Sequence, residues 1–433
     1  MIISPNSITK ISSYSLYKPN SSYFSLNEFK HKKDLTSGDE ITLDYQGIYY
    51  YLSEMTREEK IENFKNKHPY IRKNTISPKE SELKEKYKNT IKKDIFVQYD
   101  EFFKKQAPQS SCIKKGLINR GNYLVYGNKN GLDILLPSLH KTFPFLSFAF
   151  LSLPSESILC FDIKHNLSKN FISVLGTNYG RCEIFNVKNE HYENLIENNI
   201  MFKAPETIKV ESILVNEENG EDEEFYVNYV EFGEDFLAVS GSDCLYREYD
   251  LEKMKKKREV NVNAPINHCS FNSSHTLLIC AEESTSLELF DMRSYGKLST
   301  FPGGFEYNLV VRFNQFNEYF IASGNQDSSC KIWDIRKPDK HLSEFWGICD
   351  GYCDLCWLGK DKVSAVENIL YWSVFDFKNN TIQMNNFIGE GNSISFDSDT
   401  DSIYLNIIHE EYGGILHYKK IKSKVNSMNC LDL

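Results

Sequence analysis

Short apolar runs alternate with polar turns along most of the chain, and the pattern is clearest between positions 320 and 334. Phe320–Ser323 and Cys330–Trp333 are two such runs, and the polar turn between them contains Asp327. Runs of this length on either side of a polar turn predict a β-hairpin. The second run ends in Trp333 and is followed by Asp334. One hairpin cannot bury its own two faces, so we expect it to belong to a repeated unit.

The same register recurs on both sides of this hairpin. Asp334 has counterparts at Asp250, Asp291 and Asp376, with successive intervals of 41, 43 and 42 residues. A period of about 40–45 residues with a Trp-Asp pair is typical of the WD40 repeat, in which each copy forms a four-stranded blade of a β-propeller. Three weaker copies of the register lie at 131–137, 180–186 and 415–418. The sequence therefore predicts an all-β fold, a seven-bladed WD40 β-propeller.

Closure of the ring requires an outer strand for the last blade. The chain after Tyr418 offers only a short lysine-rich segment and a polar tail, whereas residues 94–103 alternate apolar and polar side chains as a strand does. We expect this segment to be the closing strand and to pair with the last blade, so that no sheet edge is left open. The predicted domains are an N-terminal extension at 1–93, the propeller at 94–422 and a C-terminal tail at 423–433.

The N-terminal extension differs in pattern from the blades. Thr56–Glu59 matches a capping box and predicts a short helix that ends near Asn66. Ser77 and Pro78 precede a charged segment that predicts a second helix, which ends near Ile91. Two roles fit the extension: it either covers one face of the ring, or it acts as a lid, brace or docking arm.

The composition is typical of a soluble globular protein, with 41% hydrophobic and 25% charged residues. The eleven cysteines are scattered, which indicates reduced core residues in a cytosolic protein. The first residues lack the pattern of a secretory signal, and the longest apolar stretch, Phe143–Leu153, is too short to span a bilayer. We expect a cytoplasmic protein with no membrane partner.

The chain offers few candidates for chemistry. Cys349, Cys353 and Cys356 are spaced like zinc ligands, but a structural zinc site needs four ligands and no second pair follows. They fall where an inner strand of a blade is expected, which favours core residues. No Gly-rich phosphate loop, nucleophile elbow or kinase signature is present. We therefore expect no metal, no cofactor, no small-molecule substrate and no catalytic residue, so the protein is not expected to be an enzyme.

The residues that mark the blades are expected to be structural. Asp243 and Asp327 occupy matching positions in turns between strands, where an Asp side chain accepts hydrogen bonds from nearby backbone N–H groups. Trp333 is expected to help hold the ring together. The structural blade markers are Asp250, Asp291, Asp327, Trp333, Asp334 and Asp376.

Basic side chains cluster at 253–258, although the net charge of the chain is −10. The negative balance argues against a surface coated for non-specific nucleic-acid binding. A local basic run is compatible with contacts to RNA phosphates, and a solvated loop is the alternative. The candidate contacts are Arg247, Lys253, Lys255, Lys256, Lys257 and Arg258.

The C-terminal tail is a second candidate contact. The spacing of Val425, Met428 and Leu431 suits a short peptide that inserts into a partner, and Lys424 precedes them. A disordered end is the alternative. Lys424, Met428 and Leu431 are therefore included among the candidate partner-binding residues.

Several stretches of the second half of the chain carry a resemblance to a known family. These are Ser242–Asp250, Pro265–His268, Gly324–Asp327, Phe387–Glu390 and Ile394–Phe396. They resemble a divergent, uncharacterised WD40-repeat family of fungi and plants, although the Gly-His pair typical of WD40 repeats is missing. The bias towards Lys, Asn and Ile looks microsporidian, and the chain is similar to microsporidian dormancy factors that bind the ribosome. The resemblance implies ribosome hibernation, in which the protein occupies the tRNA exit site and small-subunit head, contacts rRNA and small-subunit proteins, and blocks translation sterically.

A rival function is an adaptor or substrate-receptor scaffold, for example of a cullin ubiquitin ligase. The Asp-Ile-Arg at 334–336 and the Asp-Met-Arg at 291–293 echo the Trp-Asp-x-Arg pattern with which such receptors dock. Other proteins would then bind through the faces of the propeller. A lipid-binding propeller is disfavoured because the chain has no basic motif of the Phe-Arg-Arg-Gly type.

Overall fold

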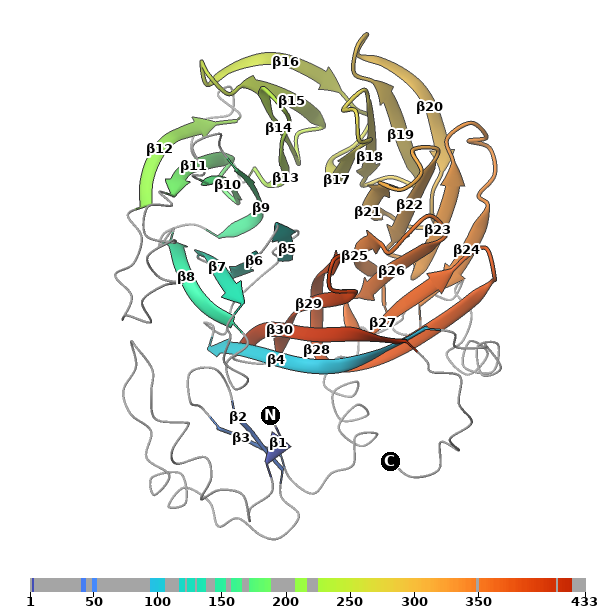
Figure 1. Cartoon of the computed structure of the whole chain (residues 1–433). Helices are drawn as coiled ribbons and strands as arrows, with labels where there is room; N and C mark the ends of the chain where they lie inside the picture. The colour runs from blue at the N-terminus through green and yellow to red at the C-terminus, as the bar shows by residue number, and fades with distance from the viewer. Residues whose placement is uncertain are drawn as a thin grey trace.

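The computed structural model arranges β-sheets around a ring (Figure 1). It describes residues 2–3, 40–43, 49–52, 94–105, 117–120, 123–128, 131–137, 145–152, 157–165, 171–187, 207–215, 225–347, 350–409 and 412–422. Within these ranges the regular elements are strands, which confirms the predicted all-β class. The predicted helices between 57 and 91, and the tail with Lys424, Met428 and Leu431, lie outside the described residues.

Two four-stranded sheets come first in the ring. One consists of β5 (Leu117–Arg120), β6 (Tyr123–Asn128), β7 (Gly131–Pro137) and β8 (Phe145–Ser152). The next consists of β9 (Ile158–His165), β10 (Phe171–Thr177), β11 (Arg181–Val187) and β12 (Thr207–Leu214). Neighbouring strands are antiparallel and follow one another in chain order, so each sheet is a meander.

Three more sheets follow the same plan, each with its strands in chain order. The first contains β13 (Val227–Phe232), β14 (Phe236–Gly241), β15 (Leu245–Asp250) and β16 (Lys255–Asn261). The second contains β17 (Ile266–Phe271), β18 (Leu277–Glu282), β19 (Ser286–Asp291) and β20 (Gly296–Pro302). The third contains β21 (Asn308–Phe313), β22 (Phe320–Asn325), β23 (Ser329–Asp334) and β24 (Ser343–Trp346).

A seven-stranded sheet completes the ring. It contains β25 (Tyr352–Trp357), β26 (Lys362–Glu367), β27 (Ile369–Asp376), β28 (Thr381–Asp397), β29 (Ser402–His409), β30 (Tyr412–Lys422) and β4 (Asp94–Lys105). The outermost strand β4 comes from the N-terminal side of the ring and pairs with β30 from Tyr412 opposite Lys105 to Lys422 opposite Asp94. Early and late parts of the chain are therefore joined by backbone hydrogen bonds. A separate three-stranded sheet contains β1 (Ile2–Ile3), β2 (Glu40–Leu43) and β3 (Tyr49–Leu52).

Strand β28 explains why the blades cannot simply be counted as sheets. It is 17 residues long and pairs with β27 through its first part and with β29 through its last part. Two complete blades would need eight strands, whereas this sheet contains seven in one continuous order. The fold is a β-propeller; the predicted number of seven blades and the predicted domain boundaries stay predictions.

The acidic residues that end the third strands share one local role. The side-chain Oδ1 atoms of Asp250, Asp291, Asp334 and Asp376 each accept a hydrogen bond from a backbone N–H two or three residues further on, at 2.9 to 3.0 Å. An Asp side chain in this position satisfies a donor that the sheet leaves unpaired where the strand ends. The repeated Asp of the sequence therefore marks the turn that leads from the third strand to the fourth.

Core side chains join neighbouring sheets. Trp333 of β23 is fully buried, and its ring lies 5.7 Å from that of Phe301 on β20 at an interplanar angle of 71°. Its indole N–H donates to Ser323 Oγ at 3.2 Å. Burying a large aromatic side chain stabilises a fold by about 3 kcal/mol, and edge-on aromatic contacts add to this. Trp333 thus ties the sheet β21–β24 to the sheet β17–β20.

The turns define two faces of the ring, because successive connections of a meander alternate between its ends. Some described turns precede a first strand or link the second strand of a sheet to the third, and we call them the upper face. They are Ser157, 178–180, Tyr226, 242–244, 262–265, 283–285, 303–307, 326–328, 350–351 and Asn368. One backbone hydrogen bond recurs among these turns: the N–H of the residue directly after the second strand donates to the carbonyl of the residue directly before the first strand. Examples are Ser242 to Tyr226 (3.0 Å), Glu283 to Pro265 (2.8 Å) and Gln326 to Tyr307 (2.9 Å). We call lower face the opposite turns, 233–235, 251–254, 272–276, 292–295, 314–319, 335–342, 358–361, 377–380 and 398–401.

Candidate binding surfaces

The predicted basic cluster lies on the outermost strand of its sheet and on the turn before it. Lys253 is in the lower-face turn, and Lys255, Lys256, Lys257 and Arg258 are successive residues of β16, all exposed. An edge strand that carries lysines is protected against pairing with another chain, so part of this pattern has a purely structural explanation. The same placement presents five basic side chains to solvent at the circumference of the ring (Figure 1).

Neighbouring groups already neutralise part of this cluster. Lys256 Nζ lies 3.1 Å from Glu259 Oε2, and Lys257 Nζ lies 3.3 Å from Asp235 Oδ2. The guanidinium of Arg258 stacks over the ring of Tyr295 at 4.5 Å. Within the described ranges, Lys253 and Lys255 make no ion pair. They are the basic residues of the cluster with most capacity left for a partner.

Arg247 does not belong to this exposed surface. Only 3% of it is accessible, because β15 lies inside the sheet. Its Nη2 donates to Asp243 Oδ2, and its Nε lies 3.5 Å from Glu259 Oε2 on the neighbouring strand. A buried guanidinium held in this way cannot reach an RNA phosphate without breaking the sheet. The predicted contact of Arg247 with RNA therefore needs correction: the residue is part of the internal structure.

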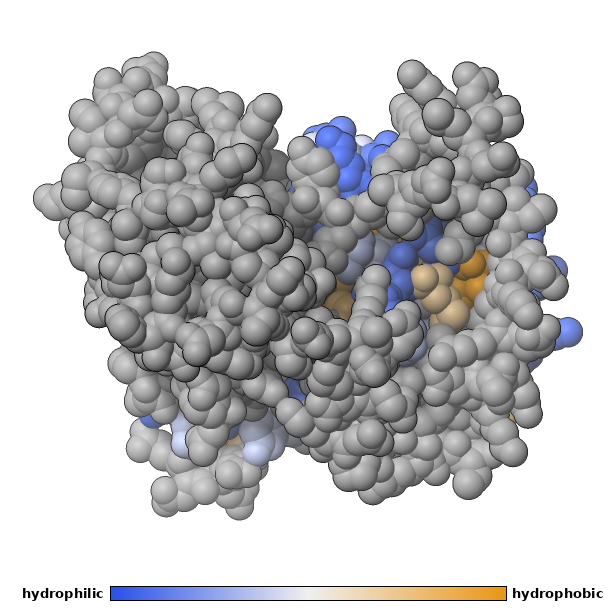
Figure 2. All heavy atoms as spheres, turned by 90° about the horizontal axis from the view of Figure 1, so that it is seen from below, coloured by the Kyte–Doolittle hydropathy of each residue, from blue (hydrophilic) through white to orange (hydrophobic). Residues whose placement is uncertain are grey.

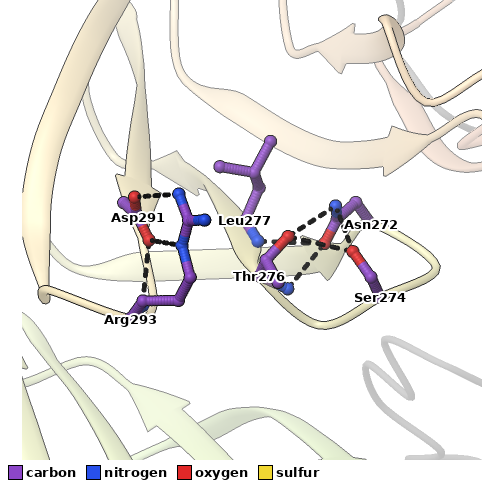
Figure 3. A network of polar contacts seen from close by, with 6 residues as sticks. All are labelled: Asn272, Ser274, Thr276, Leu277, Asp291 and Arg293. Carbon is purple, nitrogen blue, oxygen red and sulfur yellow. Dashed lines mark hydrogen bonds and ion pairs between the residues drawn. The ribbon is translucent and has the colours of Figure 1, made fainter.

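The two Asp-x-Arg sequences lie in matching turns of the lower face. The Arg293 side chain, 73% exposed, donates to both carboxylate oxygens of Asp291, at 3.0 and 2.7 Å. These hydrogen bonds lower the pKa of the Asp291 carboxyl to about 2. Figure 3 shows Arg293 lying against Asp291, and beside it the turn in which Asn272 Oδ1 accepts hydrogen bonds from the backbone N–H groups of Thr276 and Leu277. The arginine is therefore presented by a well-ordered set of turns.

Arg336 repeats this arrangement in the next sheet. It donates to both oxygens of Asp334 at 2.8 and 2.7 Å, and its guanidinium lies 4.2 Å from the centre of the Tyr319 ring. The hydrogen bonds from Arg336 hold the pKa of Asp334 below its usual value. Both arginines keep exposed surface while they pair with their aspartates. The lower face thus offers two preorganised cations to a partner.

Two of the three candidate zinc-ligand cysteines lie in the seven-stranded sheet. Cys353 and Cys356 lie on β25 and pack against hydrophobic residues of the neighbouring strands, whereas Cys349 is outside the described residues. Burial raises the pKa of the Cys356 thiol. Among the described residues, no three His, Cys, Asp or Glu side chains are grouped so that they could hold a metal ion.

The upper face carries a surface that the sequence analysis missed. Phe305 and Tyr307, in the loop before β21, are 56% and 49% exposed. Phe305 N–H donates to Asp327 Oδ2 at 2.7 Å, so the predicted structural role of Asp327 includes positioning this loop. The sequence signal for it is the pair Gly303-Gly304, since an ideal Cβ on Gly304 would lie 2.8 Å from Asp327 Oδ2. In the view from below Figure 1, the described atoms that can be seen include hydrophilic residues directly beside hydrophobic ones (Figure 2).

Two buried glutamates lie below the upper face in the sheet β17–β20. Glu282 ends β18 and is 0% exposed, and Glu288 of β19 is also buried. Glu288 Oε1 accepts hydrogen bonds from Lys297 and Asn263. Burial first, and the negative charge of Glu288 second, raise the pKa of Glu282 to about 8. Glu282 is therefore largely protonated at neutral pH.

Comparison with known proteins gives short, distant similarities. No family model matches the chain. It is 26% identical over 135 residues to the ribosome biogenesis protein WDR12 homolog of Drosophila virilis. The matched region covers 30% of this chain and 32% of that protein. It is 24% identical over 148 residues to the GATOR2 complex protein WDR24 of Gallus gallus, 31% of this chain and 21% of that protein. It is 26% identical over 187 residues to the protein DSE1 of Candida albicans, and this match covers 35% of this chain and 24% of that protein.

Together with the fold, these similarities define a divergent WD40 β-propeller. The matched regions span less than a third of the length of each of these relatives. The described residues contain no helix that is long and apolar enough to cross a membrane. The propeller fold and the WD-repeat relatives support an interaction scaffold in place of an enzyme.

Proposed function

We propose that this chain is a non-catalytic, macromolecule-binding propeller of the cytoplasm whose partner is the ribosome. In this proposal it acts as a dormancy factor that covers the tRNA exit site and the small-subunit head and so prevents translation. Support comes from the resemblance to ribosome-binding dormancy factors and from the similarity to a relative named for ribosome biogenesis. The observation that carries the proposal is the exposed basic run along β16 and the turn before it.

The electrostatics of this run make the proposal testable. Lys253 and Lys255 have no ion pair within the described residues, so both can replace counterions on rRNA phosphates. Lys256 and Lys257 would first have to release Glu259 and Asp235. Each new phosphate contact adds to the salt dependence of binding. Binding should therefore fall steeply between about 50 and 200 mM salt.

The experiment is cosedimentation of the full chain with purified ribosomes across a salt series. The double variant Lys253→Glu/Lys255→Glu should bind about tenfold or more weakly and with a shallower salt slope, because two phosphate contacts become repulsive. Lys337→Glu/Lys340→Glu is the matched control: it makes the same charge change at two exposed lysines of the lower face, in another sheet. Absence of cosedimentation at low salt, or an equal loss in both double variants, would remove the proposal.

An adaptor function is the second candidate. It is favoured by the exposed guanidinium groups of Arg293 and Arg336, which are held in matching orientations beside Asp291 and Asp334. Purification of the tagged chain from native extracts distinguishes the two functions. Copurification with ubiquitin-ligase subunits, lost when Arg293 and Arg336 are replaced by Ala, would support the adaptor in place of the ribosome binder.

A further inference from the structure

The loop 303–307 exposes the Phe305 side chain to solvent, although buried side chains beneath the loop hold the loop backbone by hydrogen bonds. Asp327, itself fully buried, accepts Phe305 N–H with Oδ2 and Ser329 N–H with Oδ1, at 2.7 and 2.8 Å. The buried Lys331 donates to the carbonyl of Gly303, and its ammonium lies 5.8 Å from the centre of the Phe305 ring. An exposed aromatic residue on a rigid support costs little entropy when it is covered by a partner. Such residues are the usual anchors of interfaces.

Neighbouring turns extend this loop into one continuous surface. Asn308 Nδ2 donates to the carbonyls of Ser284 and Ser286 at 2.6 and 2.9 Å, which ties the turn with Glu283 to the end of the loop. On the other side, Gln326 N–H donates to the Tyr307 carbonyl. Gly351 then approaches so closely that a Cβ there would lie 2.8 Å from Gln326 Cα. The surface therefore runs from Glu283 through the aromatic loop to Asp350 and Gly351.

The charge of this surface has one sign. The turns of the upper face, as far as the structure describes them, contain the carboxylates Asp243, Glu283, Glu306, Asp327 and Asp350. Asp327 is fully buried and Asp243 pairs with Arg247, which leaves Glu283, Glu306 and Asp350 for a partner. The same turns contain no Lys, Arg or His. By contrast, the described turns of the lower face carry both signs of charge. Their basic residues are Lys253, Arg293, Arg336, Lys337, Lys340, Lys360 and Lys378, and their carboxylates are Glu234, Asp235, Glu252, Glu318, Asp339, Asp361, Asp399 and Asp401. The described turns of the upper face thus differ from those of the lower face in that they contain no basic residue.

We infer that the surface formed by Glu283, 303–307, Gln326 and Asp350 binds a peptide segment rich in lysine or arginine. Carboxylates pair with the cationic heads, and the rings of Phe305 and Tyr307 accept the alkyl stems or the flat guanidinium groups. A nucleic acid would bring negative phosphates to a negative face, which disfavours it here. This site is separate from the basic run proposed to bind ribosomes. Its assay contains no ribosomes, so either proposal can fail without the other.

The test uses fluorescence anisotropy with the full chain. The probes are a labelled peptide of alternating Lys and Ala, the same peptide with Glu in place of Lys, and a short oligo-uridine RNA. Phe305→Ala/Glu306→Gln should weaken binding of the Lys peptide about tenfold, because an aromatic contact and a charge are lost. Tyr319→Ala/Glu318→Gln is the matched control, since it makes the same kind of change on the lower face of the same sheet. The control should leave the affinity within about twofold.

A second variant guards against a folding defect. Glu283 lies in a different turn from Phe305 and Glu306. On its own, Glu283→Gln should lower the affinity for the Lys peptide about threefold. Equal binding of the Lys and Glu peptides, absence of binding, or equal losses in the test and control variants would overturn the inference. So would RNA binding that depends on Phe305. A thermal midpoint unchanged by the substitutions shows that the fold has been kept.

Discussion

The sheets β13–β16 and β21–β24 carry the same residue in the same turn and use it differently. Asp243 and Asp327 each accept the backbone N–H two residues further on, from Leu245 and Ser329. The second carboxylate oxygen of Asp243 accepts from Arg247 of its own sheet. That of Asp327 accepts from the backbone of Phe305, in the loop arriving from the previous sheet. One aspartate therefore neutralises a buried cation, and the other fixes a loop that presents an exposed aromatic ring.

The third-strand cation decides between these two uses. Arg247 and Lys331 occupy the same register, opposite Val239 and Ser323. The guanidinium of Arg247 reaches Asp243, whereas the ammonium of Lys331 turns to the Gly303 carbonyl and lies 3.6 Å from Glu344. Asp327 is thereby left available to the incoming loop. A turn motif fixes where the carboxylate lies, and its long-range neighbours fix what it does.

The largest expected effect comes from removing the carboxylate that neutralises Arg247. Asp243→Ala leaves a buried guanidinium whose one remaining ion pair, among the described residues, is with Glu259 at 3.5 Å. Removing one partner of a buried ion pair lowers the free energy of unfolding by about 3 kcal/mol. We expect the free energy of unfolding, measured by urea denaturation, to fall by that amount.

Two further variants sharpen this result. Asp235→Ala removes an exposed partner of Lys257 and should change stability by less than about 0.5 kcal/mol. Asp243→Ala/Arg247→Leu should regain much of the lost stability, because no unpaired charge then remains. If Asp243→Ala costs no more than Asp235→Ala, Asp243 does not neutralise Arg247 in the way described.

This contrast shows how far the sequence alone could go. The register of Trp333 and Asp334 follows from local alternation, and the structure places both as expected at the end of a third strand. The burial of Arg247 could not be predicted in this way, because it depends on Glu259 of a neighbouring strand and on coverage by the whole sheet. The basic run on β16 could be identified from the sequence, because consecutive lysines are a local pattern.

The aromatic loop was missed for a related reason. Phe305 looks like a core residue in sequence, and its exposure depends on how closely Gly303 and Gly304 let the loop approach Asp327 and Asn308. In the structure the backbone of this loop is held by Asp327 and Lys331. Contacts of this kind join residues far apart in the chain and produce no periodic pattern in the sequence from which they could be predicted.

The sheet between the two compared sheets lacks the aspartate, and this predicts a pH dependence. Ser284 takes the place of Asp243 and Asp327, and its Oγ accepts Ser286 N–H at 3.2 Å. The third-strand position is Glu288 in place of a cation, and it lies near the buried Glu282. Burial raises the pKa of Glu282 from 4.5 to about 8. Between these pH values the unfolded chain loses the proton and the folded protein keeps it, so stability falls as the pH rises.

Glu282→Gln tests this contribution. The amide cannot ionise, so the variant should lack the part of the stability loss that occurs from about pH 5 to pH 8. We expect it to be more stable than the parent at pH 8 by about 2 kcal/mol, less than the full pKa shift implies, because the protein relaxes around the charge. Glu283→Gln is the control, since that side chain is exposed in the adjacent turn. Parallel pH profiles for the parent and Glu282→Gln would show that Glu282 ionises normally in the folded protein.

The smallest effect is expected where the turn of one sheet is converted into that of its neighbour. Asp327→Ser keeps a side-chain oxygen for Ser329 N–H, as Ser284 does for Ser286, but it no longer reaches Phe305 N–H. One lost hydrogen bond should cost about 1 kcal/mol. Amide hydrogen exchange at Phe305 should become faster, while exchange in the core strand β22 stays slow. Asp243→Ser should instead cost about as much as Asp243→Ala, because Arg247 again loses its carboxylate. If both serine variants have the same small effect and leave Phe305 exchange unchanged, the two aspartates do the same job, and the difference between these sheets lies elsewhere.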